Sequence, residues 1–148
     1  MNKGKIVVVD DEKIVTSAFS TLLKVEGFSD AHFFNNSLEA IEFLKDNEPD
    51  LIISDFLMAE MNGLEFLSKA KELHPEVSRI LLTGYADKEN AIRAINEVGL
   101  YRYIEKPWDN DELIINVKNA CESSRLISAL QLKNKELQHY SDHLQELV

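Results

Sequence analysis

The sequence predicts an α/β protein, an open parallel sheet with helices on both faces. Short apolar runs recur along the chain, and segments with helical spacing of apolar residues separate them. Three of these runs are apolar throughout, which is typical of strands covered on both faces. Gly and Pro are sparse, at 5 and 3 of 148 residues, and no internal repeat is visible. Alternating strands and helices favour a parallel sheet with right-handed crossovers.

Five runs are the strand candidates. Residues 6–9, 51–53 and 80–82 consist of Val, Ile and Leu, the composition of buried strands. Residues 31–34 and 101–104 are weaker candidates because they mix aromatic and polar side chains.

The helices between these runs carry start and stop signals. The first has an apolar stripe and meets Gly27 just past its end, where glycine is favoured. The residue before Pro75 avoids the α region, so the third helix closes at His74. The stripe of the first helix consists of Ile14, Val15, Ala18, Phe19, Leu22 and Leu23. Cap residues followed three positions later by Glu, a spacing typical of helix starts, are Asn36 with Glu39, Asn62 with Glu65, and Asp109 with Glu112.

The last helix is expected to be unusually long. It begins near Asp109 and meets neither Gly nor Pro through Val148. Its first part can cover the sheet, whereas its later part has apolar positions spaced alternately by four and three, a heptad pattern. That seam is Leu126, Leu130, Lys133, Leu137, Tyr140, Leu144 and Leu147. We expect a globular domain over residues 1–124 and a helical extension over 125–148 that forms a coiled coil. The alternative is an amphipathic helix lying on its own domain.

Charge and cysteine content exclude several classes of function. Lys plus Arg number 16 against 26 Asp plus Glu, for a net charge of −10. So acidic a chain is expected to bind neither nucleic acid directly nor an anionic membrane surface. The single cysteine, Cys121, allows no internal disulfide and fits a reducing compartment. With no long apolar run either, we expect a cytoplasmic protein.

Polar residues follow the apolar runs at one edge of the predicted sheet. Ligands of open α/β sheets bind outside the carboxyl ends of the strands. The residues that follow the runs are Asp10 and Asp11, Ser54 and Asp55, Thr83 and Gly84, and Glu105, Lys106 and Pro107. Three carboxylates, a hydroxyl and an ammonium are therefore expected to converge there.

This set of groups predicts phosphoryl chemistry. Three neighbouring carboxylates repel one another unless a cation joins them, and hard oxygen ligands suit Mg²⁺ or Mn²⁺. Lys106 and Thr83 can bind phosphoryl oxygens. The set is typical of a carboxylate that accepts a phosphoryl group. Taken singly, an Asp could be only a helix cap, Thr83 a turn residue and Lys106 a surface charge.

The motifs resemble the receiver domain of bacterial two-component response regulators. The resemblance covers about residues 4–124, with every motif present and in order. The motifs are Val7-Val8-Val9-Asp10-Asp11-Glu12, residues 55–63 beginning Asp55-Phe56-Leu57, Leu82-Thr83-Gly84, and Tyr103-Ile104-Glu105-Lys106-Pro107. It implies a flavodoxin-like, doubly wound sheet of five parallel strands in the order 2-1-3-4-5, with five helices of which the last is extended.

The resemblance also implies roles at the acidic site. Asp55 matches the phosphoacceptor. Asp11 and Asp55 match the direct metal ligands, together with the backbone carbonyl of Leu57, while Asp10 would act mainly through a metal-bound water. The implied cofactor is Mg²⁺, with Mn²⁺ as an alternative.

Lys106 matches the lysine that pairs with the phosphoryl oxygens, and its bond to Pro107 is implied to be cis. Thr83 matches the hydroxyl that moves to the phosphoryl group, and Tyr103 the aromatic switch residue behind it. The implied activity is acceptance of a phosphoryl group from a sensor histidine kinase or phosphotransfer protein, with only slow autodephosphorylation and no turnover of a metabolite. A homodimer through the C-terminal helix is the expected assembly.

The chain departs from the family's pattern near the site. Ala59 stands where proline is usual, and Leu57 and Tyr85 offer no group that could align an attacking water. We therefore expect a phosphoryl group that persists for minutes or longer. Two other functions remain open, a Mg²⁺-dependent phosphohydrolase with an aspartyl nucleophile and a pseudo-receiver that only dimerises. The motifs 82–85 and 101–108 also look like receivers attached to cyclic-dinucleotide phosphodiesterases.

Overall fold

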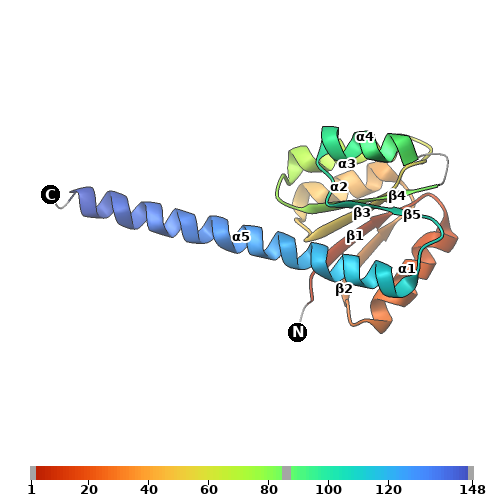
Figure 1. Ribbon diagram of the computed structural model, residues 1–148, viewed down its shortest axis with the longest axis horizontal. Coiled ribbons are helices and arrows are strands. Elements are labelled where there is room, and N and C mark those ends of the chain that lie inside the picture. The colour runs from red at the N-terminus through yellow and green to blue at the C-terminus, as the bar shows by residue number, and fades with distance from the viewer. Residues whose placement is uncertain (1–2, 85–87, 147–148) are drawn as a thin grey trace.

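The computed structural model describes residues 3–84 and 88–146 and has a central parallel sheet with helices on both faces (Figure 1). Every expected strand and helix is present, and the strand ends coincide with the expected ones or differ from them by one or two residues. The strands are β1 (Lys5–Val9), β2 (Asp30–Phe34), β3 (Leu51–Asp55), β4 (Ser78–Thr83) and β5 (Arg102–Glu105). The helices are α1 (Lys13–Val25), α2 (Ser37–Asp46), α3 (Gly63–Leu73), α4 (Lys88–Val98) and α5 (Asn110–Glu146).

The strand order is β2-β1-β3-β4-β5 and every pairing is parallel, so the predicted topology is confirmed. The order reverses between β1 and β3, because the chain leaves β1 toward β2 and returns to the other side of β1. The carboxyl ends of β1 and β3 therefore lie side by side at the position where open α/β sheets bind ligands.

The strands alternate their side chains between two cores. Ile6 and Val8 of β1 face the core covered by α1 and α5, whereas Val7 and Val9 face the core covered by α2, α3 and α4. All four side chains are fully buried. The continuous apolar runs thus arise because both faces of the sheet are covered (Figure 1).

Most of the predicted helix boundaries are confirmed. The Asn36 side chain accepts hydrogen bonds from the backbone N–H groups of Leu38 and Glu39, and Asn62 accepts one from Glu65. Gly27 directly follows Glu26, the C-cap of α1. The φ angle of Gly27 is 87°, in the left-handed region that favours glycine. α3 ends before His74, as the following proline requires.

The apolar stripe predicted for α1 is only partly buried. Phe19 and Leu23 are in the core, but Ile14 is 84% exposed and Ala18 is also exposed. Thr16 is buried in their place, and its hydroxyl accepts a hydrogen bond from Asn35. The first turn of α1 packs its polar side toward the carboxyl edge of the sheet, so the face predicted from spacing alone is wrong there.

α5 continues without a break well beyond the sheet. It has 37 residues, about 55 Å at helical rise. Ser124 is its last buried residue, and its hydroxyl donates to the carbonyl of Asp50 at 2.5 Å and accepts from the backbone N–H of Ser78 at 2.8 Å. From Arg125 to Leu144 every residue is exposed, and this part projects away from the sheet (Figure 1). Among the described residues, no helix has the length and hydropathy required to cross a membrane.

Candidate functional site

Four neighbouring strands deliver the predicted site residues to one edge of the sheet. Asp10 directly follows β1, Asp55 is the last residue of β3, Thr83 is the last of β4, and Lys106 directly follows β5. Because β1, β3, β4 and β5 are consecutive in the sheet, their carboxyl ends form a row. The structure therefore brings together residues that lie almost one hundred positions apart in the chain.

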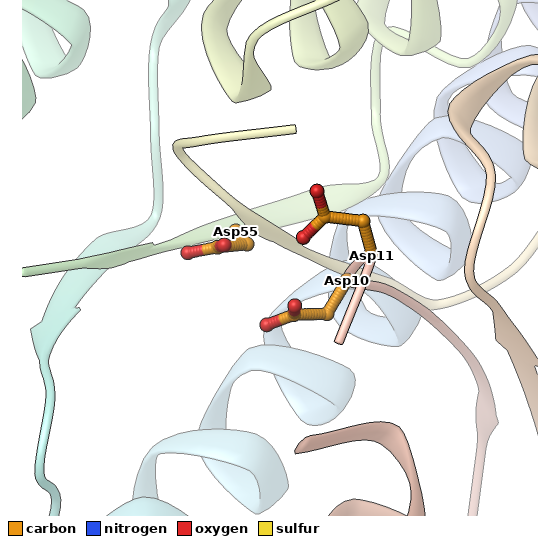
Figure 2. Close-up of side chains that lie close together, drawn as sticks. All are labelled: Asp10, Asp11 and Asp55. Carbon is orange, nitrogen blue, oxygen red and sulfur yellow. The ribbon is translucent and has the colours of Figure 1, made fainter. Parts of the chain in front are cut away.

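Three carboxylates gather at this edge. One carboxylate oxygen of each of Asp10, Asp11 and Asp55 lies within 4.8 Å of the others, and Figure 2 shows the three groups around a common space. Asp10 is fully buried and Asp55 is 7% exposed, whereas Asp11 is exposed. Such an oxygen-only cluster, open on one side, has the composition of a site for a hard divalent cation.

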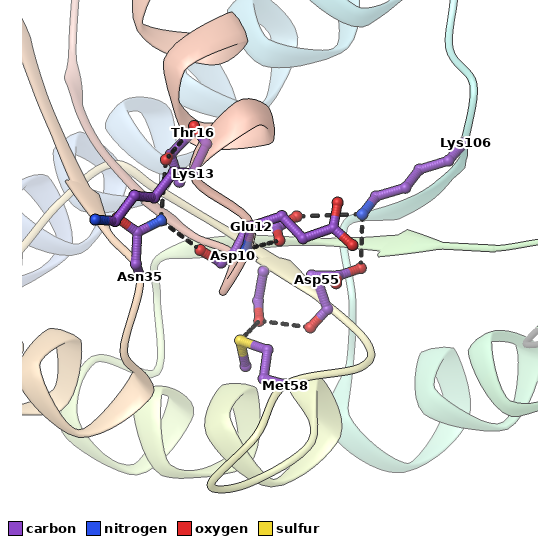
Figure 3. Close-up of polar contacts among 9 residues, drawn as sticks. Asp10, Glu12, Lys13, Thr16, Asn35, Asp55, Met58 and Lys106 are labelled. Atoms are coloured by element: carbon purple, nitrogen blue, oxygen red, sulfur yellow. Dashed lines mark hydrogen bonds and ion pairs between the residues drawn. The ribbon is translucent and has the colours of Figure 1, made fainter.

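The ammonium of Lys106 bridges two of these carboxylates. Its Nζ lies 3.1 Å from Oδ1 of Asp55 and 3.2 Å from Oδ2 of Asp10 (Figure 3). The backbone N–H of Lys106 donates to the carbonyl of Thr83 at 2.8 Å, which holds the residue at the end of β5. The bond from Lys106 to Pro107 is cis, as the resemblance implies.

Burial and charge shift the protonation equilibria of the pair. Burial, followed by the negative charge of Asp10, raises the pKa of Asp55 above its ordinary value, although Lys106 opposes this. Burial alone would lower the pKa of Lys106, but the hydrogen bond to Asp55 and the charges of Asp10 and Asp55 outweigh it and raise that pKa. Lys106 therefore remains protonated at neutral pH, and the site carries an excess of negative charge that a cation would relieve.

Backbone and side-chain donors fix the position of Asp10. Its carboxylate accepts the backbone N–H of Glu12 at 2.9 Å, and its carbonyl accepts from Nδ2 of Asn35 at 2.8 Å (Figure 3). The same Nδ2 donates to the Thr16 hydroxyl at 3.0 Å. The loop after β2 and the first turns of α1 are thereby tied to the acidic cluster.

The loop that follows Asp55 is packed tightly against its backbone. A Cβ on Gly63 would lie 2.3 Å from the carbonyl oxygen of Asp55, so α3 can start here only with glycine. The backbone N–H of Gly63 donates to the carbonyl of Phe56 at 2.7 Å, and the Ser54 hydroxyl donates to the carbonyl of Asp55 at 3.0 Å. Leu57 lies in this loop with its side chain 62% exposed.

The two predicted switch residues lie on the strands next to Asp55. Thr83 is fully buried, and its hydroxyl has no hydrogen-bond partner among the described residues. Tyr103 is half-buried on β5 and packs against the core beneath α2, α3 and α4. An unpaired buried hydroxyl costs free energy, so Thr83 is a group for which a new acceptor would be favourable.

Sequence reasoning missed the roles of three residues that shape this edge. Asn35 holds the Asp10 carbonyl, Ser54 holds the Asp55 carbonyl, and Gly63 allows the close approach of α3. The sequence places Ser54 at this edge and Gly63 within the motif 55–63, directly after the Asn62 cap, but predicts neither contact. Asn35 gave no signal, because its contact depends on tertiary packing.

Comparison with known proteins agrees with the fold. Residues 6–118 match the response regulator receiver domain family. The hydrogenase transcriptional regulatory protein HoxA of Bradyrhizobium diazoefficiens is 32% identical over 146 residues, which cover 99% of this chain and 30% of HoxA. The chain spans 25–30% of the length of the first curated relatives it matches.

Two solved structures are similar across most of both chains. A response regulator receiver domain protein from Clostridium thermocellum has 30% sequence identity and a TM-score of 0.77, covering 83% of this chain and 98% of its own. The signal receiver domain of an HD domain-containing protein from Pseudomonas fluorescens Pf-5 has 33% identity and a TM-score of 0.76, covering 82% and 96%. With its parallel sheet in the order 2-1-3-4-5 and its acidic carboxyl edge, the chain belongs to the response regulator receiver domain family, a family of two-component signalling whose members are generally not enzymes.

Proposed function

We propose that Asp55 accepts a phosphoryl group from the phosphohistidine of a sensor kinase or phosphotransfer protein. The contact of Lys106 with both Asp55 and Asp10, beside the exposed Asp11, is the observation that carries this proposal. A phosphoryl acceptor requires a nucleophile and positive charge for the incoming oxygens. Here Asp55 is the nucleophile, and the ammonium of Lys106, 3.1 Å away, supplies the positive charge.

A magnesium ion fits the donor set. Asp11 and Asp55 would hold it directly, with the backbone carbonyl of Leu57, and Asp10 would act through a bound water; Mn²⁺ suits the same oxygens. The raised pKa of Asp55, caused by burial and then by Asp10, supports this assignment because a bound cation would stabilise the ionised carboxylate. When bound, the ion neutralises charge on the phosphoryl oxygens and orients them.

In the proposed transfer, a carboxylate oxygen of Asp55 attacks phosphorus in line with the leaving histidine nitrogen. The new O–P bond forms as the P–N bond breaks, and the electron pair of that bond returns to the imidazole ring. Lys106, protonated because its carboxylate neighbours raise its pKa, donates hydrogen bonds to the phosphoryl oxygens. Asp10 keeps the ammonium over the site through its 3.2 Å contact.

The phosphoryl group would then act on Thr83 and Tyr103. The buried hydroxyl of Thr83 has no partner in the described structure, so the new acceptor oxygens offer it its first hydrogen bond. Movement of Thr83 toward Asp55 would leave space behind it for the half-buried ring of Tyr103. The faces around β4, α4 and β5 would change shape in this way and carry the signal.

Residues 125–148 would connect this switch to its output. We propose a receiver domain over 1–124 and a helical extension that pairs with a second copy or leads to an output domain; burial of α5 up to Ser124 and exposure beyond it support this division. Direct nucleic-acid binding by these residues is not expected at a net charge of −10. HoxA is a transcriptional regulator by name, so an output on DNA would belong to a separate region. We also propose a cytoplasmic location, where the lone Cys121 stays reduced.

Intact-mass measurement tests the proposal. The chain is incubated with Mg²⁺ and acetyl phosphate, and the mass is followed with time. A persistent gain of one phosphoryl group, absent from Asp55→Asn and retained in Asp111→Asn, is expected. Rapid consumption of acetyl phosphate without a stable adduct would instead indicate the phosphohydrolase, and no adduct and no turnover the pseudo-receiver.

A further inference from the structure

The exposed part of α5 carries leucines at a strict heptad interval. Leu130, Leu137 and Leu144 are 62%, 58% and 45% exposed. Nothing in the described chain covers them, and the helix projects away from the sheet (Figure 1). A solvent-exposed helix gains little from its own backbone hydrogen bonds, so a partner is needed to stabilise a segment of this length.

Two heptad registers contain these three leucines. In one, the leucines occupy position a and the companion d positions are Leu126, Lys133, Tyr140 and Leu147. In the other, the leucines occupy position d and the companion a positions are Ile127, Asn134, Ser141 and Val148. Residues 147 and 148 lie outside the described structure, so the argument depends on the others.

Packing rules favour the second register over the first, which is the seam predicted from the spacing of apolar residues. β-branched residues at position a with leucine at d favour two parallel strands, which is the arrangement of Ile127 and Leu130. The first register would place Lys133 against the same charge of a second copy in the middle of the seam. Asn134 has both a donor and an acceptor, so two copies can hydrogen-bond to each other there.

Charge favours a second copy of this chain as the occupant. Residues 125–148 contain three basic and three acidic side chains and are neutral, so the whole net charge of −10 is on the receiver part. Two extensions can therefore approach each other without net electrostatic repulsion. The charged residues of the extension are Arg125, Lys133, Lys135, Glu136, Asp142 and Glu146.

We propose that α5 forms a parallel, in-register two-stranded coiled coil in which Asn134 lies in the core and pairs with the partner's Asn134. This rests on the proposed pairing of the extension and adds its orientation, register and specificity residue. Asn134 disfavours antiparallel pairing, because there position a faces position d and its amide would meet leucine side chains without a partner. A single polar residue at position a also specifies register and oligomer state in parallel coiled coils. The ion pair of Arg125 with Asp50 and the Ser124 contact fix the start of the coil relative to the sheet.

Disulfide mapping tests orientation and register in the full chain. Single cysteines are introduced by Leu130→Cys and Leu144→Cys, and by Asn134→Cys and Lys133→Cys, and oxidised mildly with copper phenanthroline. Unsubstituted chain is the control, since Cys121 is 2% exposed and burial raises its pKa to about 12. We expect homodimeric crosslinks at both 130 and 144, and at 134 about tenfold faster than at 133, because disulfides form only when Cα atoms approach within about 7 Å.

Crosslinks of 130 with 144 but not with themselves would overturn the parallel orientation, and faster crosslinking at 133 would overturn the register. Asn134→Leu is expected to remain associated but to form trimers or larger species in sedimentation, whereas Lys135→Leu, on the outer side in both registers, stays dimeric. A purely monomeric chain that still gains a phosphoryl group on Asp55 would refute this inference and leave the proposed function standing. A dimer that crosslinks as expected but gains no phosphoryl group would refute the proposed function and leave this inference standing.

Discussion

The ammonium of Lys106, the residue after β5, lies 3.1 Å from Oδ1 of Asp55, the last residue of β3, although β4 separates these two strands in the sheet. It also lies 3.2 Å from Asp10, so one cation is shared between two buried carboxylates. One positive charge cannot compensate two negative charges at this distance, and the pKa of Asp55 stays raised, by burial first and by Asp10 second. The site is therefore held in a state that favours further positive charge.

Asp55→Asn is expected to stabilise the chain in the absence of divalent cations. Because the pKa of Asp55 in the folded state is raised above its usual 3.8, the folded chain keeps this proton to higher pH than the unfolded chain. Stability therefore falls as pH rises from 3.8 through the folded-state pKa, and the cost persists above it. The variant should be more stable than the unsubstituted chain by about 1 kcal/mol at pH 7.

Urea unfolding between pH 4 and pH 8 with EDTA measures this difference. Its growth with pH is the specific signature, and Glu72→Gln, an exposed substitution on α3, should show none. A variant that is less stable than the unsubstituted chain at pH 7 would mean that the contact with Lys106 outweighs the burial of Asp55.

Magnesium is expected to stabilise the chain through Asp11. Since a ligand that binds only the folded state adds RT ln(1 + [L]/Kd), Mg²⁺ at one hundred times its Kd should add about 2.7 kcal/mol. Asp11 is exposed, so Asp11→Ala should fold normally and lose this gain, whereas the neighbouring exposed Glu12→Gln should keep it. Thermal unfolding with MgCl₂ and with EDTA measures both; equal loss in the two variants would point to general charge screening.

Thr83→Val is expected to leave the unphosphorylated chain as stable or to stabilise it by up to about 1 kcal/mol. Its hydroxyl is buried without a partner in the described structure, so nothing is lost when a methyl group replaces it. Thr16→Val is the matched comparison, because the Thr16 hydroxyl accepts from Asn35 and its loss should cost about 1 kcal/mol. Urea unfolding of both variants measures the contrast, and destabilisation by Thr83→Val would show that its hydroxyl is already bonded.

The phosphoryl group on Asp55 is expected to persist for minutes or longer. Leu57 is 62% exposed beside the site and carries no group that could align water. Leu57→Asn should shorten the half-life by about tenfold, less than the roughly hundredfold or more of a positioned acid or base, because an amide can only orient the attacking water. Tyr85, the other residue behind this prediction, lies outside the described residues. Loss of the phosphoryl group within seconds from the unsubstituted chain with Mg²⁺ would contradict this prediction. Glu60→Gln, in the same loop, is the control.

Much of the fold is predictable because its signals are local. The runs at residues 6–9 and 51–53 are apolar throughout because helices cover both faces of the sheet, and that pattern is typical of parallel sheets. Which face of a helix is buried is harder to predict. Ile14 lies on the predicted stripe of α1 but is 84% exposed, because Thr16 turns inward and its hydroxyl accepts a hydrogen bond from Asn35. Periodicity identifies a helix, whereas tertiary partners decide which side is buried.

The residues of the candidate site also divide into those that local sequence signals predict and those that only tertiary contacts reveal. Asp10, Asp55, Thr83 and Lys106 could be placed from strand ends, because carboxyl ends of parallel strands meet at one edge. Asn35 could not be placed in this way: it follows β2, and its side chain donates to the carbonyl of Asp10 and to the hydroxyl of Thr16. These contacts depend on tertiary packing, which no local pattern in the sequence predicts.

Trapping the acyl phosphate tests the central claim most directly. After incubation with Mg²⁺ and acetyl phosphate, borohydride reduces an aspartyl phosphate to homoserine, and peptide mass spectrometry locates the changed residue. We predict homoserine at position 55 alone, and none when Mg²⁺ is omitted. Homoserine at position 10 or 11, or a phosphoryl group that remains on a Ser, Thr or His side chain, would contradict the assignment of Asp55 as the phosphoryl acceptor.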